Sequence, residues 1–191
     1  MSKIVYCVRH CEAEGQEAGA ELTEKGNAQA SALSSFFAGI PLDRLVSSPY
    51  VRAIQSMHFI QKEREMDIRV DERLKERTLC IDPLDDWLSK LEESFHNPSL
   101  SFTGGESGAE AQKRITAAVE EMESGTTLLV SHGNILTLLL NQYDSSYGFK
   151  EWAQMTNPDV YRLEMDGGYC KVERIWNRKD RLDDCKDGIG K

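Results

Sequence analysis

Long apolar runs are missing from this sequence, and none approaches the roughly 18 residues that a membrane helix needs. The N-terminus has only five apolar residues in a row before Arg9, which is too short for a signal peptide. Cysteine is scarce as well: five residues are scattered over 191, far below the density of a disulfide-stapled domain, and this suits a reducing compartment. We therefore expect a cytoplasmic protein that does not bind a membrane.

Positive charge is in deficit. The chain has 23 Lys and Arg against 32 Asp and Glu, a net charge of -9. An acidic surface repels nucleic acid and anionic lipid, so no nucleic-acid partner is expected. Any anion that binds must therefore meet a local cluster of Arg or His. Nothing in the sequence indicates an oligomeric state.

The sequence lacks the residue patterns that several known kinds of functional site require. There is no Walker-type or Rossmann glycine pattern, and no Cys is followed six positions later by Arg, as a cysteine-dependent phosphatase requires. The run Cys7-x-x-His10-Cys11 resembles half of a zinc site, but no second Cys/His cluster completes it. We expect neither a metal nor a cofactor.

Short apolar runs alternate with amphipathic stretches, which predicts an α/β fold. The expected architecture is a three-layer α/β/α sandwich with a mostly parallel, mixed central sheet. The runs at 160–165 and 169–175 flank Asp166-Gly167-Gly168 and predict a β-hairpin, which makes the sheet mixed. Residues 1–176 form one expected catalytic domain, and the charged, core-poor residues 177–191 form a C-terminal tail that we expect to fray. The other predicted strands are 4–8, 45–47, 68–70 and 127–131.

Helix signals lie between these strands. Thr23 is the expected cap of one helix, and Ser48 and Pro49 are the expected N-cap and first residue of another. The apolar spacing places Ala28, Ala32, Leu33 and Phe36 on the inner face of the first helix, and Tyr50, Ala53, Ile54, Met57 and Ile60 on that of the second. Further helices are predicted at 84–95, 111–122 and 134–142.

Three strands end in residues suited to an anion. The first ends in Arg9-His10, the second runs into Ser48 with Arg52 in the next helix's first turn, and the last parallel strand ends in Ser131-His132-Gly133. Ligands of open α/β sheets bind beyond the carboxyl ends of the strands, where helix N-termini also favour anions. Two Arg and two His therefore converge on one predicted oxyanion pocket.

At these residues the chain resembles the histidine phosphatases, the phosphoglycerate mutase-like superfamily. The resemblance spans residues 4 to about 140, and its pieces occur in the family's order. The matching pieces are Arg9-His10-Cys11-Glu12, Leu22-Thr23-Glu24-Lys25-Gly26, Ser47-Ser48-Pro49-Tyr50-Val51-Arg52-Ala53, Leu74-Lys75-Glu76, Gly105-Glu106-Ser107 and Ser131-His132-Gly133.

The resemblance implies a role for each matching residue. His10 would be the nucleophile and carry the phosphoryl group on one ring nitrogen, which requires a neutral imidazole with its other proton held by a backbone acceptor. Arg9, Arg52 and His132 would surround the phosphoryl oxygens, with Gln16 and the backbone N–H of Gly133 as further donors.

Glu76 would be the general acid for the leaving oxygen and then the base for water, roles that favour a raised pKa. Another branch of the family takes its acid from an Asp directly after the second His, but here that position is Gly133. Asp71, Glu72 and Asp82 are rival acids.

Cys11 departs from the family, which normally has Gly at this position. A positive φ would strain Cys11, whereas a close backbone approach would place its thiol against the nucleophile or substrate. One hypothesis is that nearby Arg and His lower the pKa of the thiol and make it oxidation-sensitive. The alternative is a tolerated small substitution.

The sequence thus predicts a metal-independent phosphomonoesterase that acts on a small phosphorylated substrate through a phosphohistidine. A phosphoglycerate-type mutase would use the same residues, but family mutases carry extra segments here, and only 55 residues separate Glu76 from His132. A weakly active or non-catalytic phospholigand-binding protein is the third reading, because of Cys11. The substrate itself is not indicated.

Overall fold

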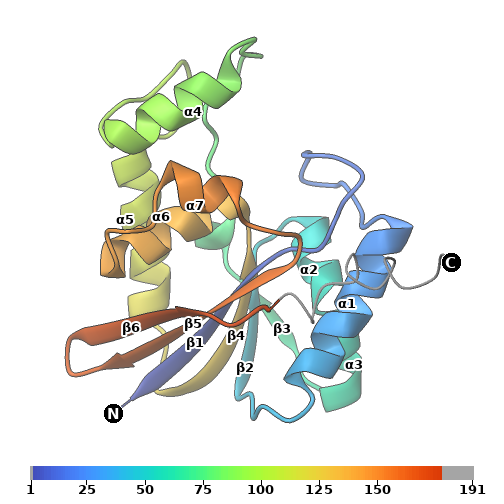
Figure 1. Ribbon diagram of the computed structural model, residues 1–191. Coiled ribbons are helices and arrows are strands. Elements are labelled where there is room, and N and C mark those ends of the chain that lie inside the picture. The colour runs from blue at the N-terminus through green and yellow to red at the C-terminus, as the bar shows by residue number, and fades with distance from the viewer. Residues whose placement is uncertain (1, 178–191) are drawn as a thin grey trace, which may run out of the picture.

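A six-stranded sheet with the order β3-β2-β4-β1-β5-β6 runs through the computed structural model, which describes residues 2–177 (Figure 1). Neighbouring strands are parallel from β3 through β1, whereas β1–β5 and β5–β6 are antiparallel. The predicted mixed α/β sheet is confirmed. The strands are β1 (Lys3–Arg9), β2 (Arg44–Ser47), β3 (Ile68–Val70), β4 (Gly125–Ser131), β5 (Asp159–Asp166) and β6 (Tyr169–Arg174).

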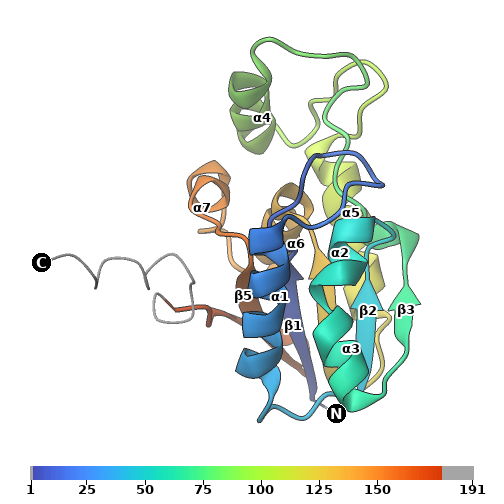
Figure 2. The ribbon, with the colours of Figure 1, turned by 90° about the vertical axis from the view of Figure 1, so that its right-hand side faces the viewer.

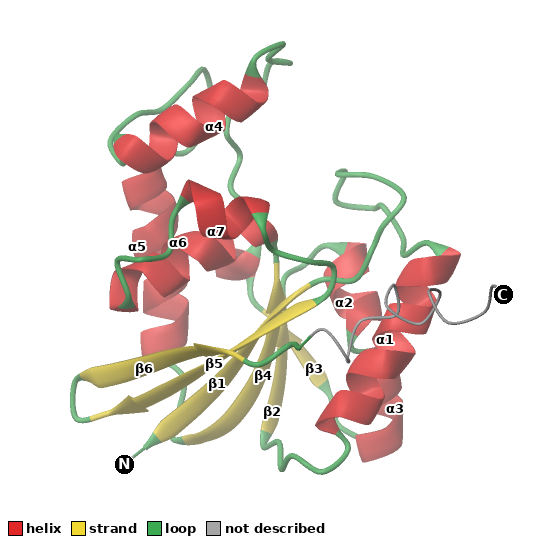
Figure 3. Ribbon diagram, viewed as in Figure 1, coloured by secondary structure: helices red, strands yellow, loops and turns green. Residues whose placement is uncertain are grey.

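Helices cover both faces of this sheet (Figure 3). The group α1 to α3 packs on one face and α5 and α6 on the other, while α4 and α7 lie at the end where β1 and β4 finish (Figure 2). The helices are α1 (Glu24–Phe37), α2 (Val51–Ser56), α3 (His58–Arg64), the 3₁₀-helix η1 (Glu72–Leu74), α4 (Trp87–His96), α5 (Gly108–Glu120), α6 (Gly133–Tyr143) and α7 (Phe149–Ala153). No helix among residues 2–177 is long and apolar enough to cross a membrane.

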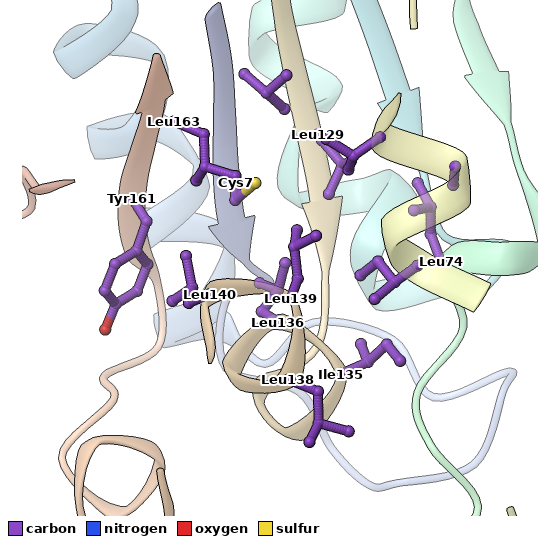
Figure 4. Close-up of a cluster of buried hydrophobic side chains, with 14 of the residues drawn as sticks. Cys7, Leu74, Leu129, Ile135, Leu136, Leu138, Leu139, Leu140, Tyr161 and Leu163 are labelled. Atoms are coloured by element: carbon purple, nitrogen blue, oxygen red, sulfur yellow. The ribbon is translucent and has the colours of Figure 1, made fainter. Parts of the chain in front are cut away.

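The core lies on both sides of the sheet because successive strand residues point to opposite faces. Along β1, Val5 and Cys7 pack toward α5 and α6, while Tyr6 and Val8 pack toward α1 to α3. Figure 4 shows Leu139 of α6 on the side of the helix that faces Leu129 and Cys7, whereas Leu138 points away from the strands. This burial fixes the strand positions, and so the strand ends that carry the site.

The helix after β2 differs from the prediction. It begins at Val51 with Tyr50 as N-cap, so Ser48 is not the cap and Pro49 is not its first residue. It also breaks at Met57 into α2 and α3. Tyr50 and Ile54 are half-buried rather than buried. The Ser48 hydroxyl instead pairs with Nε2 of His132 at 2.7 Å.

The first helix is capped as predicted, since the Thr23 side chain accepts from the N–H of Gly26 at 2.9 Å. Its predicted inner face was partly wrong: Ala28 is exposed and Ala32 and Phe36 are half-buried. The buried apolar residues are Ala30, Leu33 and Phe37. Helix α4 begins at Trp87 rather than residue 84, and η1 and α7 were not predicted because each is too short for a periodic pattern.

The predicted hairpin is confirmed, with Gly167 and Gly168 at φ of 56° and 88°, values that glycine adopts without strain. Beyond β6, Trp176 is buried against the ring of Phe36 at 5.2 Å between centroids. The domain boundary after 176 stays a prediction, and residues 178–191 of the predicted tail lie outside the described part of the chain.

Candidate active site

A cavity of about 680 Å³ opens at the carboxyl ends of the parallel strands. It forms there because β1 and β4 end in register, with Arg9 paired to Ser131. Five of the predicted site residues line it: Arg9, His10, Gln16, Glu76 and Gly133. The other two, Arg52 and His132, are buried beside His10 and are not part of the cavity wall.

The His10 ring is held in one tautomer. Its Nδ1 lies 2.7 Å from the carbonyl oxygen of Cys11, and a carbonyl only accepts, so the proton sits on Nδ1 and Nε2 carries the lone pair. The side chain is 8% exposed. Burial, reinforced by the charges of Arg52 and Arg9, lowers the pKa of His10 to about 3, against the opposing effect of its bond to Cys11. The ring is neutral at physiological pH, as a nucleophile must be.

The segment before β5 fixes the backbone and charge next to this ring. The Nδ2 of Asn157 donates to the His10 carbonyl at 2.7 Å, and the Met155 carbonyl accepts from Nη1 of Arg9 at 2.8 Å. Within residues 2–177, the buried Nε of Arg9 has no hydrogen-bond partner. Asn157 was missed in the sequence, where a Thr-Asn-Pro segment carries no signal of its own.

Arg52 forms the buried side of the site. Its Nε donates to Nε2 of His10 at 3.2 Å, and its Nη1 donates to the carbonyls of Gln16 and Glu17 at 3.1 and 2.7 Å. The guanidinium also lies over the ring of Tyr50, 4.8 Å from its centroid. Helix α2 places Arg52 here because its first turn follows directly on the end of β2.

His132 is the N-cap of α6 and is almost fully buried. Its Nδ1 lies 3.4 Å from Nη2 of Arg52, which can only donate, so Nε2 holds the proton and donates to the Ser48 hydroxyl at 2.7 Å. Burial, followed by the effects of His10 and Arg52, lowers the pKa of His132 well below its usual value. The two histidine rings stand edge to face, 5.1 Å apart.

Glu76 is held on the first turn of α6. Its Oε1 accepts from the N–H groups of Arg77 and Ile135 at 2.8 and 2.9 Å, and its Oε2 accepts from that of Asn134 at 3.1 Å. The helix N-terminus expected to meet phosphate thus also binds a carboxylate.

The rival acids lie elsewhere. Asp71 is bound by Arg73, and Glu72 and Asp82 are exposed outside the cavity lining. Glu12, which was not considered as an acid, does line the cavity, but its carboxylate accepts from the Thr23 hydroxyl and pairs with Lys25.

Gly133 opens α6 against Arg9. A Cβ at this position would lie 3.2 Å from Nε of Arg9 and 3.3 Å from Nε1 of Trp152, closer than ordinary contacts. The glycine therefore allows the guanidinium to lie against the start of the helix. Gln16, by contrast, is exposed at the cavity rim.

Cys11 does not behave as the reactive-thiol hypothesis expects. Glu65 is the one non-glycine residue with positive φ among those described, so Cys11 is unstrained. Its side chain is fully buried in a small cluster with Leu22 and Ala30. Burial raises the pKa of its thiol to about 12, so the predicted lowering by Arg and His was wrong. Cys7, the first residue of the Cys7-x-x-His10-Cys11 run, packs in the core under α6. Residues 2–177 contain no cluster of three metal-ligating side chains.

Solved structures similar to this one include both phosphatases and mutases. A mycobacterial glucosyl-3-phosphoglycerate phosphatase superposes with a TM-score of 0.74 at 21% identity, covering 91% of this chain and 98% of that one. A phosphoglycerate mutase from Bacillus anthracis gives 0.74 at 19% identity, covering 94% and 95%. YhfR of Bacillus stearothermophilus gives 0.70 at 23% identity, covering 90% and 96%. At these identities the likeness establishes the fold.

The sequence itself carries the family assignment. No curated protein matches it. Residues 5–178 match the histidine phosphatase superfamily (branch 1), nearly the whole length of the described chain. Members of this superfamily are phosphatases or mutases, and a phosphohistidine mechanism is typical of them. The chain belongs to the histidine phosphatase superfamily.

Proposed function

We propose that this protein hydrolyses small phosphomonoesters through a phosphohistidine on His10, without a metal. The observation that carries the proposal is the state of His10: a neutral ring at the cavity wall, with its proton fixed on Nδ1 and a lone pair on Nε2. A nucleophile needs this neutral state, in which the ring nitrogen that would attack carries a lone pair and not a proton.

In the first step, Nε2 of His10 attacks phosphorus and the bond from phosphorus to the ester oxygen breaks. Glu76 gives its proton to the leaving oxygen, so an alcohol departs. In the second step Glu76 takes a proton from water, whose oxygen attacks the phosphohistidine, releasing inorganic phosphate and restoring His10. Arg9, Arg52, His132, Gln16 and the N–H of Gly133 stabilise charge on the phosphoryl oxygens in both steps.

Arg52 must shift for this to happen. In the free protein its Nε donates to the atom that attacks, at 3.2 Å. An incoming phosphate supplies better acceptors for a guanidinium than an imidazole nitrogen does. Substrate binding then draws Arg52 onto the phosphoryl oxygens and frees the Nε2 lone pair.

A mutase would use the same groups but return the phosphoryl group to a second hydroxyl instead of to water. The short connection between Glu76 and His132 favours hydrolysis, because the segments that close the site in family mutases are absent from that stretch. Phosphate release separates the two activities, since a mutase releases little. A purely phosphate-binding protein would release none.

The test is phosphate release from 4-nitrophenyl phosphate between pH 5 and 8, with chelator and reductant present. We expect chelator-resistant turnover that is lost in His10→Ala and kept in His58→Ala, an exposed histidine of α3. An alkaline quench during turnover is expected to trap phosphate on the peptide that contains His10. Turnover that survives in His10→Ala, or a label on another residue, would overturn the proposal.

A further inference from the structure

The cavity is larger than a phosphoryl group requires. At about 680 Å³ it falls in the range of pockets that enclose a whole small ligand, roughly 300–1,000 Å³. Five of its lining residues, Arg9, His10, Gln16, Glu76 and Gly133, are assigned to the phosphoryl group or its transfer. The remainder of the cavity is available to the leaving group, and its lining therefore carries information on the substrate.

The rest of the lining includes four large apolar side chains, Leu79, Trp87, Leu91 and Trp152, together with polar side chains such as Glu12, Arg77 and Asn134. Trp87 begins α4 and Trp152 lies on α7, the two helices that stand beyond the strand ends (Figure 2). The indole rings meet edge to face, with centroids 6.3 Å apart and an angle of 86° between their planes. Helices distant in sequence thus build one aromatic wall from this pair of tryptophans.

The two tryptophans of this wall differ in how far neighbouring side chains cover them. Phe149 stacks on Trp152 at 5.4 Å and fixes its ring, whereas Trp87 is 51% exposed. Three of the five large apolar side chains that are exposed in residues 2–177 lie in the short stretch Ile81–Leu88, around Trp87. Of these three, Trp87 lines the cavity, and exposed apolar surface at a cavity marks a place where a ligand excludes water.

We infer that this wall binds an aromatic leaving group, so that the preferred substrates are phosphomonoesters of benzyl-type or aryl alcohols. The inference rests on the proposed hydrolysis. A flat ring packs on an indole edge or face and gains from both apolar burial and ring geometry. Leu79 and Leu91 add further apolar surface to the same cavity, and neither offers a hydrogen bond.

A sugar would also stack on tryptophan, but it suits this wall less well. Its ring carries hydroxyls around the edge, and any hydroxyl that faced Leu79 or Leu91 would lose water without a replacement partner. A benzene ring has no such groups to satisfy. The lining therefore favours an aromatic ring over a pyranose.

The experiment compares phosphate release from four primary alkyl monoesters: benzyl, cyclohexylmethyl and ethyl phosphate, and glucose 6-phosphate. All four share one kind of ester bond, so differences in kcat/KM report mainly on recognition. We expect benzyl phosphate to be best. Trp87→Ala is expected to lower its kcat/KM by about threefold to tenfold, the effect of one lost aromatic contact, while ethyl phosphate changes less than about twofold.

Two variants serve as controls. Trp87→Phe keeps a ring and is expected to retain most of the preference, and Leu88→Ala removes an exposed apolar neighbour outside the cavity lining and is expected to retain all of it. An unchanged ratio of benzyl to ethyl turnover in Trp87→Ala would overturn the inference. So would equal use of cyclohexylmethyl phosphate, or a preference for glucose 6-phosphate. If no ester releases phosphate, the proposed hydrolysis itself fails.

Discussion

Nε of Arg52 lies 3.2 Å from Nε2 of His10 and donates a hydrogen bond to it. The buried guanidinium is also tethered to two carbonyls of the loop that follows β1, those of Gln16 and Glu17. In the free protein one side chain from α2 therefore joins the proposed nucleophilic nitrogen to the loop at the cavity rim. A planar fork of donors makes this possible, and an ammonium has no equivalent geometry.

Arg52→Lys tests this relationship. The lysine keeps the charge but cannot reach His10 and the loop carbonyls together, so we expect kcat/KM on 4-nitrophenyl phosphate to fall by about 10²–10³-fold, the loss typical of one transition-state donor. Arg64→Lys is the control, since Arg64 lies on α3 outside the site. Thermal unfolding of both variants checks that the fold survives. Activity near wild type in Arg52→Lys would contradict the role given to its guanidinium.

Glu76→Gln tests the general acid. The amide cannot give up a proton, and we expect kcat/KM on ethyl phosphate, which reports on the first step alone, to drop by about 10²–10⁴-fold. The drop on 4-nitrophenyl phosphate should be much smaller, because nitrophenolate leaves without help. A purely structural role, through the three N–H groups that Glu76 accepts, would reduce both substrates equally. Glu72→Gln, at an exposed rival position, should change neither.

Cys11→Ala tests the buried thiol. Since burial raises its pKa to about 12, the thiol has almost no thiolate at neutral pH, and we expect hydrogen peroxide to inactivate wild type and variant at the same rate. The alanine keeps the carbonyl that accepts from His10. Faster inactivation of the wild type would restore the redox hypothesis.

Cys11→Gly removes the whole side chain and with it the packing against Leu22 and Ala30. We expect a loss of about 1–2 kcal/mol in the free energy of unfolding, from the lost packing and the added backbone freedom. Urea denaturation measures it. A more stable Cys11→Gly would mean that the cysteine is strained after all.

The depressed pKa of His10 predicts how stability depends on pH. Below pH 6.5 the unfolded chain takes up a proton at this residue, while the folded ring stays neutral down to about pH 3. Stability contributed by the neutral ring is thus complete above 6.5 and is lost as pH falls, by up to about 1.4 kcal/mol per pH unit. His10→Gln should flatten the slope of unfolding free energy between pH 6 and 4 by up to that amount. An unchanged slope would show that folded His10 titrates normally.

The sequence by itself determined the mixed sheet and the strand ends that carry the candidate site. Strands such as 127–131 are short runs with an apolar centre and can be recognised without tertiary contacts. Because parallel strands end at one edge, Arg9-His10 and Ser131-His132-Gly133 had to lie together, and the structure places them side by side. The family assignment followed from the order of these same short pieces. The individual roles of the site residues stay predictions.

Only the tertiary structure decided what depends on the direction of a side chain. The Cys11 thiol packs in a cluster with Leu22, and the Ser48 hydroxyl pairs with His132 instead of capping a helix. The fold also joins Trp87 to Trp152 across 65 positions of sequence. Local periodicity specifies which face of an element is buried, but contacts between elements depend on how their faces pack, and no local pattern encodes that packing.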